Sequence, residues 1–243
     1  MRTYPNIDIV KLARNKIELP SIVTDANKYA MGMFLFLFAF FTYISTNHFH
    51  LFTPRTLPLS WVDELVPLVP NTVWLYISEY FLFIVVYIFC RSPLNLNRYF
   101  YSFFVVYFLS TIIFIVWPTT YPRHLFPLPT NINEITYYVF NMLRNADTPA
   151  NCCPSLHVSS VYLASFVYLD EDKRKFPFFF TWATVVAVST LTTKQHYLFD
   201  IILGFLMAAV TYWFFSRCAN YTSPAAVAAK VRARTRTRAR TAD

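Results

Sequence analysis

Glycine and charge are both scarce in this sequence. Only two glycines, Gly32 and Gly204, occur in 243 residues, which excludes a glycine-rich loop that cradles phosphate with backbone N–H groups. Charged residues make up 14% of the chain, whereas a soluble domain carries about 25%. Hydrophobic residues make up 56%, and they come in long runs instead of amphipathic stripes. This pattern is typical of a chain that lies in lipid.

The sequence also lacks a disulfide framework and the ligand spacing of a metal site. Its four cysteines are Cys90, Cys152, Cys153 and Cys218. Cys152 and Cys153 are adjacent, and a disulfide between neighbours would be strained. Residues 1–28 are mostly polar, so they do not resemble a cleavable signal peptide, whose apolar core comes early. We expect neither a metal nor another cofactor.

Six apolar segments are separated by polar connections. They span residues 29–47, 71–90, 99–117, 155–169, 176–193 and 197–216. Most are close to the ~20 residues that a helix needs to cross a bilayer, and a backbone in lipid must satisfy its own hydrogen bonds. We therefore predict an all-α, polytopic membrane protein with six transmembrane helices. Its parts are a cytoplasmic N-terminal segment (1–28), a six-helix catalytic domain (29–217) and a basic, disordered cytoplasmic tail (218–243).

Two of the connections are long. Residues 48–70 hold Arg55, Asp63 and Glu64, which we expect in a solvated loop. Residues 118–154 are rich in proline, asparagine and threonine, and such a composition predicts an irregular loop.

The basic residues predict the orientation in the membrane. Most of the 21 lysines and arginines share one side if both termini and the connections 91–98 and 170–175 are placed together. The positive-inside rule assigns that side to the cytoplasm. The arginines between 232 and 240 would then contact anionic lipid headgroups, and we expect no nucleic-acid partner. The opposite side, which is periplasmic, extracellular or lumenal, keeps four basic residues: Arg55, Arg123, Arg144 and Lys194. Three of them lie near the candidate chemistry, which indicates an anionic substrate group.

His196 and Asp200 lie four residues apart at the outer end of the last apolar segment. Residues at this spacing face the same side of a helix. The carboxylate can therefore accept the Nδ1 proton of the imidazole and leave Nε2 free to attack. The alternative is that Asp200 only caps the helix while His196 lies among the headgroups, because structural pairs of this kind are common.

The run Pro154-Ser155-Leu156-His157 lies where the fourth apolar segment begins. N–H groups at a helix start attract phosphate, Ser155 can cap the helix or donate to a phosphate oxygen, and His157 can protonate a leaving oxygen. The alternative is an ordinary helix start with an interfacial histidine. Both histidines and Asp200 nevertheless map to one face of the membrane, which favours a catalytic site.

These runs resemble motifs of the type 2 phosphatidic acid phosphatase superfamily. That family carries the motifs KxxxxxxRP, PSGH and SRxxxxxHxxxD on a six-helix membrane core. The second motif is similar to residues 154–157, with Leu156 in place of glycine. The third motif matches at Ser189, His196 and Asp200.

The chain departs from the family pattern at further positions. Thr190 stands where the third motif has arginine. In the first motif Arg123 is kept, while Val116 replaces the lysine and His124 the proline. The combination of PSLH with QHYLFD is closest to the inositol phosphorylceramide synthase-like branch of the superfamily. The resemblance covers residues 55–215 approximately.

The resemblance implies catalytic roles. His196 resembles the nucleophile that forms a phosphohistidine, Asp200 its orienting partner, and His157 the general acid that protonates the departing alcohol. Arg123 would bind the phosphate. No metal is needed in such a mechanism, since fixed cations and helix N–H groups hold the phosphoryl oxygens.

Other side chains are expected near the phosphate because of their position. Lys194 would supply the positive charge that Thr190 lacks, and Ser155 would donate to an oxygen. Arg144 is a further candidate, but it lies in a long loop, so the sequence does not fix its position relative to the other residues. Glu79 falls about nine residues into the second apolar segment, roughly 13 Å deep at 1.5 Å per residue. An acid at that depth is costly and is a functional candidate, although a protonated glutamate bonded to a neighbouring helix fits equally well.

We therefore expect a metal-independent membrane phosphatase acting on a lipid phosphate or diphosphate. Transfer to an acceptor alcohol, as in a sphingolipid headgroup synthase, is an alternative that the sequence does not decide, because acceptor choice depends on cavity shape. A non-catalytic transporter or membrane scaffold is an alternative of another class. Against it, the candidate residues lie at helix ends and not at mid-membrane, where transporter sites usually lie. Neither the lipid nor the oligomeric state follows from the sequence.

Overall fold

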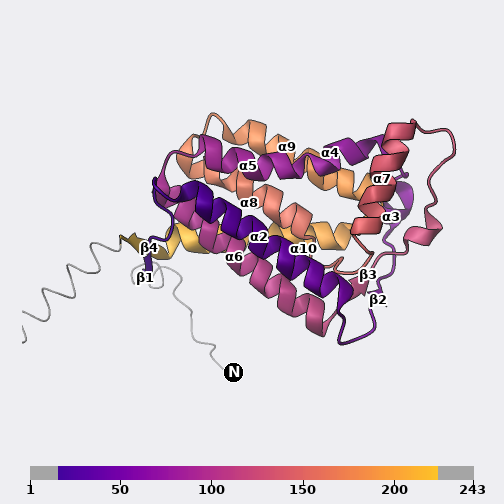
Figure 1. The fold of residues 1–243 in the computed structure, drawn as a ribbon, viewed down its shortest axis with the longest axis horizontal. Coiled ribbons are helices and arrows are strands. Elements are labelled where there is room, and N and C mark those ends of the chain that lie inside the picture. The colour runs from indigo at the N-terminus through magenta and orange to yellow at the C-terminus, as the bar shows by residue number, and fades with distance from the viewer. Residues whose placement is uncertain (1–15, 224–243) are drawn as a thin grey trace, which may run out of the picture.

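The computed structural model describes residues 16–223, whose long helices run side by side in one bundle (Figure 1). The helices of the bundle are α2 (Lys28–His48), α4 (Val73–Ile77), α5 (Glu79–Phe89), α6 (Pro93–Val116), α8 (Leu156–Glu171), α9 (Phe176–Thr192) and α10 (Leu198–Arg217). The connections hold α3 (Trp61–Leu65), α7 (Glu134–Ala146) and the 3-10 turns η1 (Pro70–Thr72) and η2 (Arg123–Leu125). Each of the six predicted segments is helical, and the second is divided at Ser78.

Helix α8 lies at the centre of the bundle. Every residue from Val158 to Tyr168 is buried, and the helix packs against α5, α6, α9 and α10. The outer helices carry large apolar side chains on their exposed faces, among them Phe41, Phe81 and Trp213. Because soluble monomers rarely expose apolar patches of this extent, these faces suit the hydrocarbon of a bilayer.

Four helical segments of the described chain are long and apolar enough to cross a membrane. They are Lys28–His48, Pro70–Phe89, Pro93–Val116 and Leu198–Arg217. Helix α9 is apolar but shorter, with 17 residues, and α8 has 16. The predicted helical architecture is confirmed, whereas the number of six spans stays a prediction.

The third long helix begins earlier than its hydropathy indicates. The sequence predicts a start near residue 99, but α6 starts at Pro93. Ser92 caps it by accepting a hydrogen bond from the backbone N–H of Asn95 (3.4 Å), and proline suits the first helical position. The added turn carries Asn97, which is buried and hydrogen-bonded to the backbone of residues 22–23. Hydropathy misses this turn because its polar groups are satisfied by a distant segment.

The connection 118–154 is not wholly irregular, so the prediction of a loop is wrong for part of it. It contains α7, whose N-cap Asn133 accepts hydrogen bonds from the backbone N–H groups of Ile135 (2.9 Å) and Thr136 (3.4 Å). The helix is amphipathic, and it packs against η1 and α4 across one end of the bundle (Figure 1).

Two pairs of short parallel strands qualify the all-α prediction. Strand β2 (Arg55–Thr56) pairs with β3 (Thr119–Thr120) at the same end as α3 and α7, and β1 (Ile17–Pro20) pairs with β4 (Ala219–Thr222) at the opposite end (Figure 1). The prediction of disorder from residue 218 onward is therefore wrong for β4. The basic run between residues 232 and 240, with its expected lipid contact, lies outside the described residues.

Hydrogen bonds tie together the turns at each end of the bundle. At the end with β1 and β4, Glu171 closes α8 and accepts from the backbone N–H of Arg91 (2.8 Å). At the other end, the backbone N–H of Ser155 donates to the carbonyl oxygen of Asp200 (3.1 Å). The starts of α8 and α10 are thus joined where the candidate residues lie.

Candidate active site

His157 and His196 lie close together where α8 and α10 begin. Their ring centres are 5.6 Å apart, and the ring planes are inclined by 58°. His157 is on the first turn of α8, and His196 directly precedes the N-cap of α10. Reacting atoms must approach to roughly 3–3.5 Å, so rings at this separation can contact the same substrate group.

The contacts of His196 determine which ring nitrogen carries its proton. Nδ1 lies 2.9 Å from the carbonyl oxygen of Cys152 and 3.4 Å from Oδ2 of Asp200. A carbonyl oxygen can only accept, so Nδ1 is the donor and Nε2 keeps a free lone pair. Oδ2 of Asp200 also accepts from the backbone N–H of Tyr197 (3.0 Å). The carboxylate therefore caps α10 and also contacts the imidazole. The two interpretations of Asp200, as a helix cap and as the partner of His196, do not exclude each other.

Close packing of α10 on α8 sets the distance between the two histidines. A Cβ atom on Gly204 would lie 2.5 Å from the carbonyl oxygen of Ser155 and 3.2 Å from Oγ of Ser159. Ser159 instead donates to the carbonyl oxygen of Gly204 (3.0 Å). Ser155 is the N-cap of α8 and accepts from the backbone N–H of Val158 (3.3 Å). Only a residue without a side chain allows this approach.

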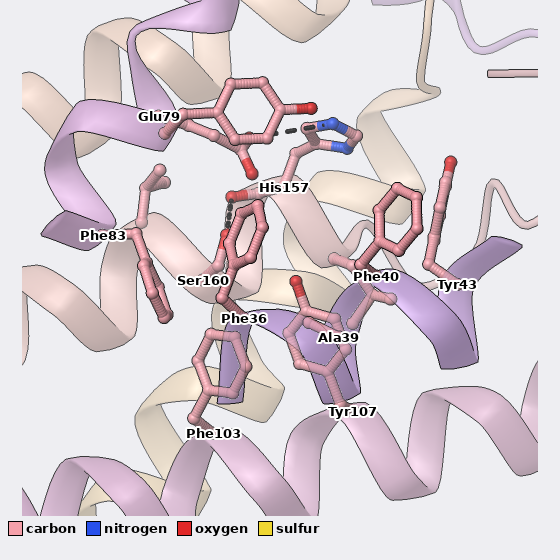
Figure 2. A pocket seen from close by; sticks show the side chains of 13 residues that line it. Phe36, Ala39, Phe40, Tyr43, Glu79, Phe83, Phe103, Tyr107, His157 and Ser160 are labelled. Atoms are coloured by element: carbon pink, nitrogen blue, oxygen red, sulfur yellow. Dashed lines mark hydrogen bonds and ion pairs between the residues drawn. The ribbon is translucent and has the colours of Figure 1, made fainter. Parts of the chain in front are cut away.

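Helices α4 and α5 bring two polar side chains to His157. The Tyr76 hydroxyl lies 2.6 Å from Nε2, and Oε2 of Glu79 lies 3.8 Å from the same atom. Figure 2 shows Glu79 and His157 beside one cavity. The candidate Glu79 thus joins the site as the first residue of α5. Tyr76 belongs to no motif, so nothing in the sequence gives a reason to expect it at the site.

Arg123 reaches the same region from η2. Its guanidinium forms an ion pair with Asp147, with Nη2 3.1 Å from Oδ2, and Nη1 donates to the carbonyl oxygen of Asp147. Asp147 in turn accepts from the hydroxyl of Tyr43, whose ring lies edge-on to His157 at 6.4 Å. The charge of Arg123 acts on His157 as well. Neither Asp147 nor Tyr43 was predicted, since each lies outside the motifs.

Lys194 and Arg144 are engaged elsewhere. Nζ of Lys194 donates to the carbonyl oxygens of Asp63 (2.6 Å) and Val66 and lies 4.5 Å from the centre of the Phe126 ring. Burial lowers the pKa of this ammonium, and the charge of Asp63 opposes the shift. Arg144 donates to the carbonyl oxygen of Phe126 (3.0 Å). No contact within residues 16–223 joins either cation to the histidines by a hydrogen bond.

Asp63 has a different place from the one expected. The sequence predicts a solvated loop, but Asp63 is 2% exposed. Its Oδ1 accepts from the backbone N–H of Leu198 (2.8 Å), and its Oδ2 accepts from that of Ser60 (2.8 Å). Asp63 therefore anchors the start of α10 to α3. Composition could not show this, because the partner lies at the far end of the sequence.

A cavity of about 130 Å³ lies beside His157, between α2, α5, α6 and α8. Its polar groups include Glu79 and His157, while most of its wall is aromatic (Figure 2). Phe36 and Phe40 line it and are also exposed on the outside of the bundle. The cavity thus connects His157 with the surface that lipid would cover.

No group of three His, Cys, Asp or Glu side chains suited to hold a metal ion occurs within the described part of the chain. The expectation that no metal takes part stays a prediction.

The profile of the PAP2 superfamily matches residues 44–214, more than two thirds of the chain. This range contains both histidines, Asp200 and Arg123. No curated protein matches the chain. With its apolar helices and this match, the chain belongs to the type 2 phosphatidic acid phosphatase (PAP2) superfamily, whose members are helical membrane phosphoesterases.

Proposed function

We propose that the chain is a membrane phosphatase that acts on a lipid phosphate or diphosphate through a phosphohistidine at His196. One observation carries the proposal: two imidazoles from different elements lie 5.6 Å apart, and one of them holds its proton on Nδ1. A nucleophile and a proton donor placed around one gap are the parts that phosphoryl transfer through a covalent intermediate needs.

In the first step, Nε2 of His196 attacks phosphorus. The N–P bond forms as the bond between phosphorus and the ester oxygen breaks, and its electron pair goes to the leaving oxygen. Protonated His157 gives its proton to that oxygen and becomes neutral. Asp200 and the carbonyl of Cys152 hold the Nδ1 proton and stabilise the positive charge on His196. Arg123 faces the negative phosphoryl oxygens.

In the second step, neutral His157 takes a proton from water. The water oxygen bonds to phosphorus, the N–P bond breaks, and its electron pair returns to Nε2 of His196. Phosphate leaves, and both imidazoles regain their starting state. If the hydroxyl of an acceptor alcohol replaces water, the same residues catalyse a phosphotransfer, as in the inositol phosphorylceramide synthase-like branch.

Among the basic candidates, we propose Arg123 as the phosphate ligand. Two of the three N–H donors of Lys194 already bind carbonyl oxygens, and the ammonium also lies over the Phe126 ring. Ser155 is fully buried and already caps α8. Their contacts favour a structural role, in which both residues hold the loops that carry the histidines.

The cavity beside His157 supports a lipid as substrate. An aromatic wall that reaches the outer surface of the bundle can hold the part of an apolar chain next to the ester oxygen. The protein is an integral membrane protein by its helices and its family, so such a substrate can reach the site from the bilayer.

We further propose six spans, with α8 and α9 completing the four long helical segments. Helix α8 is short for a span, but it is enclosed by other helices and meets little lipid. The end with the histidines carries Arg55, Arg123, Arg144 and Lys194, while the other end carries more lysines and arginines, among them Arg91, Arg98 and Arg217 (Figure 1). The positive-inside rule favours a cytoplasmic location for that second end and a periplasmic, extracellular or lumenal location for the site.

The proposal is tested by phosphate release from detergent-solubilised protein in the presence of a chelator, with phosphatidic acid or isoprenyl diphosphate as substrate. We expect activity that survives chelation, is inhibited by vanadate and falls to background in His196→Ala and Asp200→Asn. Full activity in both variants would refute the proposal. Product analysis with phosphatidylinositol, with and without ceramide, separates hydrolysis from transfer.

A further inference from the structure

Each of the two candidate catalytic imidazoles has a carboxylate beside it. Asp200 lies 3.4 Å from Nδ1 of His196, and the two residues share one helix start. Glu79 lies 3.8 Å from Nε2 of His157, but it comes from α5 and belongs to none of the motifs. The second pair therefore exists only through the packing of α5 against α8.

The surroundings of Glu79 leave His157 as its counter-charge. Both side chains are 11% exposed, and Oε2 of Glu79 is buried without a hydrogen-bond partner among the described residues. An ionised carboxylate in such a place is costly unless a positive charge compensates it. The other groups near His157 are the Tyr76 hydroxyl and the Tyr43 ring, which are neutral, the His196 ring and the more distant charge of Arg123. The Ser160 hydroxyl, which interacts with Glu79, is also neutral.

The two nitrogens of His157 differ in their contacts. Nε2 faces the Tyr76 hydroxyl at 2.6 Å and the Glu79 carboxylate beyond it. Nδ1 is buried and has no hydrogen-bond partner within residues 16–223. When His157 is protonated, Nε2–H can donate to the Tyr76 oxygen, while Glu79 supplies the negative charge. Nδ1 is then the end left for a substrate oxygen.

We propose that Glu79 is a positioning residue for His157. It rests on the proposed function, in which His157 gives its proton to the leaving oxygen. Glu79 stabilises the imidazolium and holds its Nε2 end, so that Nδ1 delivers the proton. The proton moves from Nδ1 to the leaving oxygen as the P–O bond breaks and returns to Nδ1 from the attacking water. Glu79 contacts no substrate atom, and while His157 is neutral between the two steps, the charge of Glu79 favours the return of the proton to Nδ1.

If Glu79 acts through His157, the loss of activity in a Glu79 variant should depend on the leaving group of the substrate. If Glu79 has only a structural role, the loss should not depend on it. A lipid alkoxide must be protonated as it leaves, whereas a nitrophenolate leaves without a proton. Loss of the general acid therefore slows cleavage of a lipid phosphate much more than cleavage of nitrophenyl phosphate. A variant whose active site is merely distorted would lose activity toward both substrates.

The test compares Glu79→Gln with the wild-type full chain on both substrates. We expect kcat/KM for phosphatidic acid, which reports formation of the phosphohistidine alone, to fall by roughly 10²–10³-fold, in the range of a lost general acid. The kcat/KM for nitrophenyl phosphate should change by less than about threefold. Glu79→Asp, which keeps the charge, should recover part of the loss. Glu64→Gln removes an exposed carboxylate and is the matched control.

Equal losses on the two substrates would overturn the inference. If nitrophenyl phosphate is not turned over at all, the decision passes to a double-mutant cycle with His157→Ala on phosphatidic acid. Glu79→Gln should then add little to the loss in His157→Ala, because both act through one imidazole; additive losses would contradict the inference. A wild-type protein without activity on any lipid phosphate would count against the proposed function itself.

Discussion

Arg123 and Asp147 form a largely buried ion pair near the two histidines. Nη2 lies 3.1 Å from Oδ2, and the side chains are 9% and 12% exposed. The hydroxyl of Tyr43 donates to Asp147 as well, so the carboxylate is itself held in place. Asp147 therefore fixes the direction in which the guanidinium points, and Nε of Arg123 has no hydrogen-bond partner among the described residues.

The first prediction concerns the guanidinium. Arg123→Lys keeps the charge but loses the planar fork, which pairs with Asp147 and, in the proposed mechanism, also binds phosphate. We expect kcat/KM for a lipid phosphate to fall by about 10- to 100-fold, the equivalent of one or two charge-assisted hydrogen bonds. Arg144→Lys is the control, because Arg144 donates to the carbonyl oxygen of Phe126. Similar losses in the two variants would argue against a special role for Arg123.

The second prediction concerns the carboxylate of the same pair. Asp147→Asn leaves Arg123 buried with only neutral partners on that side, and breaking a buried pair costs about 3–5 kcal/mol. We expect a clear drop in the thermal unfolding temperature in detergent, together with a rise in KM. An unchanged unfolding temperature would show that the pair adds little to stability.

The third prediction uses the two glycines. Gly204→Ala would place a Cβ atom 2.5 Å from the backbone oxygen of Ser155, so α8 and α10 must move apart. We expect a loss of about 1–3 kcal/mol in stability, as for other overpacked sites, and a fall in kcat because the histidines separate. In Gly32→Ala the new Cβ meets the Tyr87 ring at 3.1 Å. This contact is with a side chain and not with the backbone, and Gly32 lies near the start of α2, away from the histidines, so this control should keep its activity.

The fourth prediction separates two roles for Lys194. If the ammonium holds α3, Lys194→Met leaves the carbonyl oxygens of Asp63 and Val66 unsatisfied and costs about 1–3 kcal/mol of stability. If it binds phosphate, as the sequence predicts, the variant should mainly raise KM. We expect the loss of stability. Thermal unfolding and steady-state kinetics of the same preparation distinguish the outcomes, and Lys173→Met, at an exposed lysine, serves as control.

The fifth prediction concerns the adjacent cysteines beside Asp200. Both are buried, and burial raises the pKa of the Cys152 thiol, with the charge of Asp200 adding to the rise. The thiolate is the reactive form, so little of it exists at neutral pH. Incubation with N-ethylmaleimide at pH 7 should leave phosphatase activity intact in the folded protein. Rapid inactivation under these conditions would show that the loop opens far more readily than its burial indicates.

Hydropathy placed the six helical segments because long apolar runs have few other structures available in lipid. It could not place the first turn of α6, where buried Asn97 is satisfied by the backbone of residues 22–23. Nor could it find α7 within a polar connection, or pair β1 with β4 across almost the whole chain. Each of these depends on a partner that is distant in sequence.

The same division applies to the candidate site. His196 and Asp200 follow from one helical spacing, and His157 from a recognisable helix start. Asp63, Asp147, Tyr43 and Tyr76 carry no local signal, since each takes its meaning from a contact between separate elements.

By itself, the sequence determined a helical chain rich in lipid-facing residues and the chemical groups available for phosphoryl transfer, because periodicity and motif spacing are local properties. Only the tertiary structure decided that the centres of the two imidazole rings lie 5.6 Å apart, that Glu79 lies beside one of them, and that Lys194 binds the carbonyl oxygens of Asp63 and Val66. These relations depend on how closely α8, α10 and α5 pack, which is a property of the whole bundle.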